Sequence, residues 1–185
     1  MASELYVETL KGLTSGANAN KVIVPAGQTL DASAGSMVLP AGVGGKVLQV
    51  VEASTYTKVD TATSTQIETG VSATITPSST SSKIVIFAFT TVSTSNVNTY
   101  VSFHFYRDST DLGYLADLVG YNGTANYVGQ NVHFCQVDSP NTTSATTYKL
   151  MFGNEGNVGT ASAQGDAGSA TERGRGQIIL MEIAG

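Results

Sequence analysis

Two histidines and the carboxylates near them are the groups in this sequence that could hold a metal ion. His104 and His133 lie in stretches expected to be strands, and either Asp108 or Asp138 could join them. Zinc and similar ions bind imidazole and carboxylate ligands, and known motifs bring those ligands together at recurrent spacings. Two histidines at unrelated spacing do not form such a motif. We therefore interpret them as surface or partly buried strand residues, and we predict neither a metal ion nor another cofactor.

Two acids in the stretch 107–111 could act as a catalytic pair. Glycoside hydrolysis uses two carboxyl groups on opposite sides of the scissile bond, and Asp108 and Asp111 could supply them. Aspartate and serine are also common turn residues between strands. We favour the turn, and the sequence predicts no catalytic residue.

Nucleophilic catalysis could in principle use one of the many serines, or Cys135 with His133. No nucleophile elbow or similar local signature supports such a site. Cys135 stands in an apolar stretch, so we expect it to be a small core residue. The glycine-rich segment 42–46 resembles a phosphate-binding loop only superficially, because a strand-like stretch follows its lysine where that motif requires Ser or Thr and then a helix.

Tyrosines interleaved with glycine and asparagine mark the most plausible binding stretch. Exposed aromatic faces and side-chain amides are typical of surfaces that bind sugars or proteins. The predicted recognition residues are Tyr114, Tyr121, Asn122 and Tyr127. The alternative is a long loop that packs its tyrosines onto the domain.

The composition indicates an all-β protein. Charged residues make up 12% of the 185 residues, about half of the roughly 25% usual in soluble domains. Ser, Thr, Asn and Gly must then supply the polar surface. These residues suit turns and exposed strand faces, whereas Ser, Thr and Asn side chains compete with the backbone hydrogen bonds of a helix.

Charge and hydropathy exclude several classes of partner. The formal net charge is −5 and the basic residues are scattered, apart from Arg173 and Arg175, so we expect no nucleic-acid binding. No apolar run is long enough to span a membrane, and the first residues lack the basic-then-apolar pattern of a secretory signal. A single cysteine permits no intramolecular disulfide. We therefore expect synthesis in a cytoplasm and no membrane insertion.

Hydrophobic patterning predicts several strands in a β-sandwich or jelly roll. The continuous apolar run 84–89 predicts a central strand covered on both faces, and the glycine-rich stretch 153–176 predicts long surface loops. The other expected strands cover residues 46–51, 71–76, 101–106, 132–137, 148–152 and 177–183.

A near-repeat marks the first 45 residues as a separate unit. Residues 22–27 and 37–42 both read as a short aliphatic strand followed by Pro-Ala-Gly, in which proline and glycine favour a turn. Two such elements cannot enclose a core, so their neighbours should come from other chains. We predict an attachment and trimerisation segment at 1–45 and a β-sandwich domain at 46–185. A flexible arm with two ordinary loops is the alternative.

Short patterns along nearly the whole chain resemble fibre-like virion proteins of marine tailed bacteriophages. The resemblance implies a virion structural role, a homotrimer and contact with a host surface glycan or protein, and it transfers no catalytic residue. The residues that carry it are 5–16, 22–30, 47–51, 70–84, 106–110, 146–150 and 179–183.

The resulting prediction is a non-catalytic fibre or capsid decoration protein, made in the host cytoplasm and carried on the virion. Its partners would be two further copies of itself and another virion protein bound through residues 1–45. Two alternatives belong to other classes: a virion-associated carbohydrate-active enzyme such as a depolymerase, and a free lectin-like domain. The sequence leaves open whether the protein sits on the head or the tail.

Overall fold

The computed structural model describes residues 46–121, 123–124, 127–165 and 174–185, which form strands and no helix. The predictions for residues 1–45 and for Asn122 lie outside these ranges. No helix that could cross a membrane occurs in the described part of the chain. The strands are β1 (Val47–Thr55), β2 (Val59–Thr61), β3 (Ile67–Ile75), β4 (Lys83–Thr94), β5 (Val101–Arg107), β6 (Thr110–Val119), β7 (Val128–Asp138), β8 (Thr146–Asn154), β9 (Ala161–Ala163) and β10 (Gly176–Ile183).

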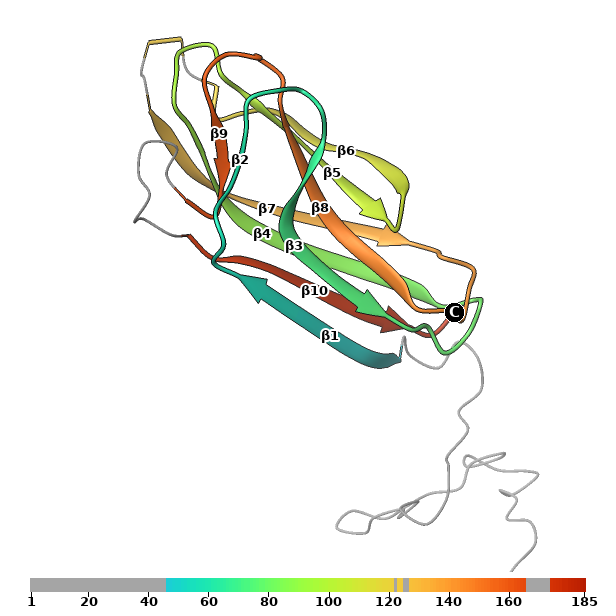
Figure 1. The fold of residues 1–185 in the computed structure, drawn as a ribbon. Coiled ribbons are helices and arrows are strands. Elements are labelled where there is room, and N and C mark those ends of the chain that lie inside the picture. Colours follow the sequence, from blue (N-terminus) through green and yellow to red (C-terminus); the bar gives the residue numbers. More distant parts are fainter. Residues whose placement is uncertain (1–45, 122, 125–126, 166–173) are drawn as a thin grey trace, which may run out of the picture. The chain divides into compact units, whose positions relative to one another are not determined.

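The strands form two antiparallel sheets packed face to face (Figure 1). The four-stranded sheet has the order β3-β8-β5-β6. In the six-stranded sheet, β1, β10, β4 and β7 lie side by side, and the short β9 and β2 continue beyond the end of β10. Eight long strands in these two orders make a jelly roll, which confirms the predicted fold class.

The core lies between the inner faces of the two sheets and follows the period-two alternation of each strand. Phe103 and Phe105 on β5 point inward, as do Leu150 and Phe152 on β8, and all four are fully buried. Ile84 and Ile86 on β4 meet them from the six-stranded sheet. The strands predicted at 101–106 and 148–152 are therefore confirmed as β5 and β8.

Two predictions about the six-stranded sheet were wrong. β4 is central, but its residues 83, 85, 87, 89 and 91 face outward, and Phe87 is 42% exposed. Cys135 lies opposite Phe87 on β7 and is exposed. Both errors have one cause: several residues of this sheet that point away from the core, among them Val85, Phe87 and Val137, are apolar. The alternation of the two faces is therefore hidden in this part of the sequence.

The stretch 153–176, expected to be surface loops, contains the buried strand β9. Ala161, Ser162 and Ala163 pair with β4 on one side and with β2 on the other, and all three are buried. Their side chains are small enough to fit between these strands and the core. Small residues carry little hydrophobic signal, so the pattern did not reveal the strand.

Buried polar groups tie the ends of the strands together. The carboxylate of Glu182 accepts hydrogen bonds from the main-chain N and Oγ of Ser78, the Oγ of Ser82 and the Nε2 of Gln49, at 2.6 to 2.7 Å. Between the sheets, Asp138 on β7 accepts hydrogen bonds from the Tyr148 hydroxyl and the Arg107 guanidinium. These contacts fix β7 and β10 against the strands and turns around them.

Candidate functional site

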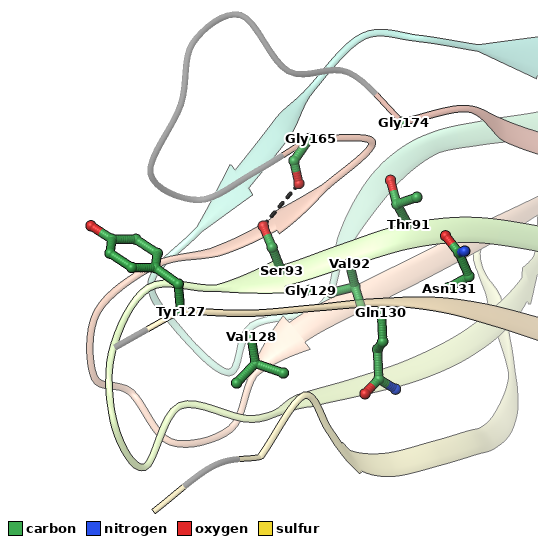
Figure 2. Close-up of a pocket in the computed structure, with 10 residues that line it drawn as sticks. All are labelled: Thr91, Val92, Ser93, Tyr127, Val128, Gly129, Gln130, Asn131, Gly165 and Gly174. Atoms are coloured by element: carbon green, nitrogen blue, oxygen red, sulfur yellow. Dashed lines mark hydrogen bonds between the residues drawn. The ribbon is translucent and has the colours of Figure 1, made fainter. Parts of the chain in front are cut away.

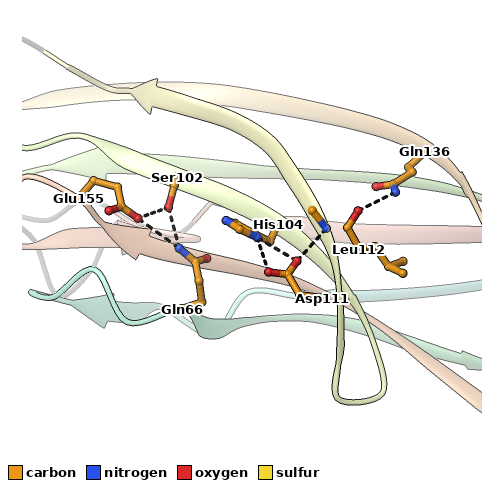
Figure 3. Close-up of polar contacts among 8 residues, drawn as sticks. Gln66, Ser102, His104, Asp111, Leu112, Gln136 and Glu155 are labelled. Atoms are coloured by element: carbon orange, nitrogen blue, oxygen red, sulfur yellow. Dashed lines mark hydrogen bonds and ion pairs between the residues drawn. The ribbon is translucent and has the colours of Figure 1, made fainter.

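In the described part of the chain, a histidine and an aspartate come closest to the geometry of a catalytic acid–base pair. His104 on β5 and Asp111 on β6 face the outside of the four-stranded sheet, and His104 Nδ1 lies 2.9 Å from Asp111 Oδ2 (Figure 3). The imidazole is 5% exposed because the Tyr114 ring lies over it, with ring centroids 4.0 Å apart. This arrangement orients a histidine in the way that an acid–base pair requires.

The electrostatics of the pair fit a structural role. Burial acts to raise the pKa of Asp111, but hydrogen bonds from His104 and from the Gly113 amide outweigh it and hold the pKa below its ordinary value. The carboxylate is therefore ionised at neutral pH. Among the described residues, His104 Nε2 is buried without a hydrogen-bond partner, so none of them places a nucleophile within hydrogen-bond reach of it.

The serine nearest along the same strand face is engaged elsewhere. Ser102 Oγ donates to Glu155 Oε1 at 2.6 Å and accepts from Gln66 Nε2 at 2.6 Å (Figure 3). These contacts join β5 to the segments that precede β3 and follow β8. A Ser-His-Asp site therefore does not form around His104, because its nucleophile would have to be a serine hydroxyl that points to another carboxylate.

Of the two acids considered as a glycosidase pair, Asp108 is a turn residue and Asp111 is the second residue of β6. Asp108 lies in the two-residue loop between β5 and β6 at a φ of 52°, a left-handed conformation that aspartate tolerates. Its Oδ1 accepts a hydrogen bond from the Thr147 amide at 2.9 Å. Asp111 accepts hydrogen bonds from His104 and the Gly113 amide. Each carboxylate therefore stabilises local structure, and the turn interpretation is confirmed for Asp108.

The two histidines lie on different outer faces of the sandwich. His104 belongs to the four-stranded sheet, whereas His133 on β7 faces outward from the six-stranded sheet against Phe89, with ring centroids 5.9 Å apart. The core separates them, so they cannot share an ion. In the described ranges, no three groups from His, Cys, Asp and Glu come together as metal ligands would.

The predicted recognition tyrosines are exposed but lie in different places. Tyr114, 68% exposed, covers His104 in the middle of the four-stranded sheet. Tyr121 follows β6, contacts Tyr100 edge to face and donates a hydrogen bond to Asn98. Tyr127 precedes β7. Tyr114 is thus set apart from the loops that carry the other two, and the recognition role of all three stays a prediction.

Tyr127 borders an open hollow of about 460 Å³ on the six-stranded sheet (Figure 2). Hydroxyl, amide and aromatic groups line it, a mixture that suits a sugar or a polar peptide. The lining residues are Thr91, Val92, Ser93, Tyr127, Val128, Gly129, Gln130, Asn131, Gly165 and Gly174. Only Tyr127 among them was predicted from the sequence, because Thr91 and Asn131 become neighbours through the pairing of β4 with β7.

The chain enters the sandwich at the end opposite to Tyr121 and Tyr127. The carbonyl of Lys46 accepts a hydrogen bond from the Ala184 amide, and Val47 pairs with Ile183. At that end β4 begins with Lys83, whereas Tyr127 lies beside its other end, where Thr94 pairs with Val128. Figure 1 shows β1 beginning near the C-terminus and β7 beginning at the far end. The domain is therefore a jelly roll with two distinct ends.

Comparisons with known proteins show only a limited similarity of fold. No protein-family model matches the chain, and no curated protein matches it. Two solved structures of infectious bursal disease virus are similar in part. The Gx strain structure is 14% identical with a TM-score of 0.41, covering 80% of this chain and 41% of that chain. The VP2 subviral particle is 12% identical with a TM-score of 0.42, covering 86% and 45%. The chain thus spans less than half of either, and the jelly-roll assignment stands on its own strand order.

Proposed function

We propose that this chain is a non-catalytic structural component of a bacteriophage virion surface, either a tail fibre or a capsid decoration protein, and that it works as a homotrimer. Residues 1–45 attach the chain to another virion protein. The jelly roll projects from that attachment and presents its far end to the surroundings, including a host surface glycan or protein.

The observation that supports this proposal is that Lys46 and the exposed tyrosines lie at opposite ends of the sandwich. The attachment segment joins the domain at Lys46, beside the C-terminus. Tyr121 and Tyr127, which are 53% and 59% exposed, lie at the opposite end with the hollow. The sequence resemblance to phage fibre-like proteins supports the same arrangement.

A depolymerase is the alternative that the site geometry favours least. Such an enzyme needs two carboxyl groups positioned across a sugar-binding cleft. Asp108 and Asp111 instead accept hydrogen bonds from Thr147, Gly113 and His104. If the enzyme reading were right, polysaccharide cleavage by the purified chain would disappear in Asp108→Asn or Asp111→Asn.

A free lectin-like domain is the second alternative, because jelly rolls occur in lectins as well as in virus particles. The hollow beside Tyr127, with Asn131 and Thr91, is the observation that favours sugar binding. Lectin activity and a virion location are separable: a virion protein can bind a glycan, but a free lectin is absent from particles.

Mass spectrometry of purified particles of the phage that encodes this chain tests the proposal. The chain should be present at a copy number that is a multiple of three, and it should remain after washing in high salt. The matched sample is the particle-free supernatant of the same lysate. A chain confined to that supernatant would contradict the virion role and favour the free lectin.

A further inference from the structure

The hollow beside Tyr127 lies on the outer face of the six-stranded sheet, where β4 pairs with β7. The pairing places Thr91 opposite Asn131 and Ser93 opposite Gly129. Because side chains alternate along a strand, Tyr127 and Asn131 share one face of β7 with Gly129 between them. Figure 2 shows the side chains of Thr91, Ser93 and Asn131 on this same side of the two strands.

Gly129 leaves the floor of the hollow bare. A Cβ at this position would meet no atom within 4 Å, so the space above the main chain is open. At the rise of an extended strand, the four residues from Tyr127 to Asn131 span about 13 Å. The hollow therefore has an aromatic ring at one end, an amide at the other and an uncovered stretch of strand between them.

The Asn131 side chain is the polar group best placed to hold a ligand. It is exposed, and it makes no hydrogen bond to any residue in the described ranges. The Ser93 hydroxyl, by contrast, donates a hydrogen bond to the Gly165 carbonyl at 2.8 Å (Figure 2). The Thr91 hydroxyl is buried, so Thr91 contributes shape and not a hydrogen bond. A side-chain amide can both donate and accept hydrogen bonds.

The lining disfavours a charged ligand and an apolar anchor. None of the ten residues around the hollow is charged, so an anion would lose water there without gaining an ion pair. Val92 is buried in the core, and Val128 points to the opposite side of β7 (Figure 2). Neither valine forms a pocket of the kind that receives an anchor residue from a protein partner.

We propose that the hollow binds a neutral carbohydrate, with one sugar ring against the face of Tyr127 and hydroxyl groups hydrogen-bonded to the Asn131 amide. An aromatic ring offers an apolar face to the C–H groups of a sugar, and the sugar hydroxyls match the donors and acceptors of the amide. The volume of about 460 Å³ lies in the range of roughly 300–1,000 Å³ typical of small-ligand sites. This inference rests on the host-surface contact proposed above and names its chemistry.

Amide chemical shifts of the isotope-labelled full chain measure the binding. The neutral probes are glucose, galactose, mannose, N-acetylglucosamine, lactose and maltose, each titrated to millimolar concentration, and glucuronic acid is the charged counterpart. At least one neutral sugar should give saturable shifts at Gly129 and Asn131. Glucuronic acid should bind more weakly than that sugar, because no basic group among the lining residues pairs with its carboxylate.

Two substitutions in the hollow test the site without altering the core. Gly129→Leu fills the open space above the strand, and Tyr127→Ala removes a ring that is 59% exposed. Each should raise the dissociation constant about tenfold or more. Tyr114→Ala, at an exposed ring on the other sheet, is the matched control and should leave the constant unchanged. Circular dichroism and melting temperature verify that each variant is folded.

Several results would overturn the proposal. One is the absence of a saturable shift with every neutral sugar, and another is binding that persists unchanged in folded Gly129→Leu. Shifts at Gly129 and Asn131 with a tryptic digest of casein, but with no sugar, would identify a peptide site instead. The virion role fails separately, because it is judged by the chain's presence in particles, whereas this titration needs only the purified protein.

Discussion

Glu182 shows how a single buried polar residue can contribute to the stability of this sandwich. Burial acts to raise its pKa, but the hydrogen bonds from Ser78, Ser82 and Gln49 outweigh burial and lower the pKa from 4.5 to about 2. The folded state therefore favours the ionised form. That preference stabilises the fold fully above the unfolded pKa, and it is lost as the pH falls from about 5 towards 2.

Replacing Glu182 by glutamine should remove this pH dependence. We expect Glu182→Gln to lower the free energy of unfolding by roughly 2 to 3 kcal/mol at pH 7, and the gap to the parent protein should close as the pH approaches 2. Urea unfolding at several pH values measures both effects. Glu68→Gln, at the half-exposed pair with Lys149, is the control and should cost under about 0.5 kcal/mol. A gap that stayed constant with pH would contradict the account.

The Tyr148 hydroxyl is a second residue-scale test. Burial, followed by its hydrogen bond to Asp138 at 2.7 Å, raises the pKa of Tyr148 above its ordinary value. Tyr148→Phe should lower the free energy of unfolding by about 1 to 2 kcal/mol, because it removes a buried hydrogen bond to a charged group. Tyr56→Phe, at a ring that is 53% exposed, should have almost no effect in the same denaturation series. Similar losses in both variants would argue against the buried contact.

At the scale of elements, the packing of the strands leaves room for a side chain at some glycine positions and not at others. A Cβ on Gly153 of β8 would lie 2.6 Å from the main-chain oxygen of Ser64 and 2.5 Å from Gln66 Nε2, whereas a Cβ on Gly129 of β7 would meet no atom within 4 Å. Gly153→Ala should therefore destabilise the protein by about 1 to 3 kcal/mol through overpacking, and Gly129→Ala should be nearly neutral. Thermal unfolding of the two variants measures the difference. Equal melting temperatures would contradict the prediction, because they would mean that the loop before β3 moves aside for the added methyl group at no cost.

The sequence predicted those elements in which one face is apolar and the other polar. Phe103 and Phe105 alternate with Ser102 and His104, and the alternation gave both the strand and its inner face. The same reasoning failed for Cys135, because apolar side chains point to both sides of β7 and β4 and no alternation distinguishes inside from outside. A doubly apolar strand can be covered by its own chain or by another, and only the sheet order shows which side is open.

The candidate site was predictable only in part, for a related reason. Tyr127 was found from its aromatic and amide surroundings, but the hollow also needs Thr91 and Asn131, which β4–β7 pairing brings together. His104 and Asp111 were each noted in the sequence with different partners. Their pairing depends on the two-residue turn at Asp108 and on irregular β5–β6 register, which no sequence spacing indicates.

At the scale of the whole molecule, the low content of charged residues concerns the entire surface of the domain and not one site. Lys46 and the C-terminus lie at one end of the sandwich, and Tyr121 and Tyr127 lie exposed at the other. A surface rich in Ser and Thr with few charges depends little on ion pairing, so its contacts should resist high salt.

The mass of the full chain in solution tests this account most directly. Light scattering on the purified protein at micromolar concentration should give three times the 19.1 kDa of one chain, at both low and high salt. A single, well-folded species of 19.1 kDa under the same conditions would contradict the account.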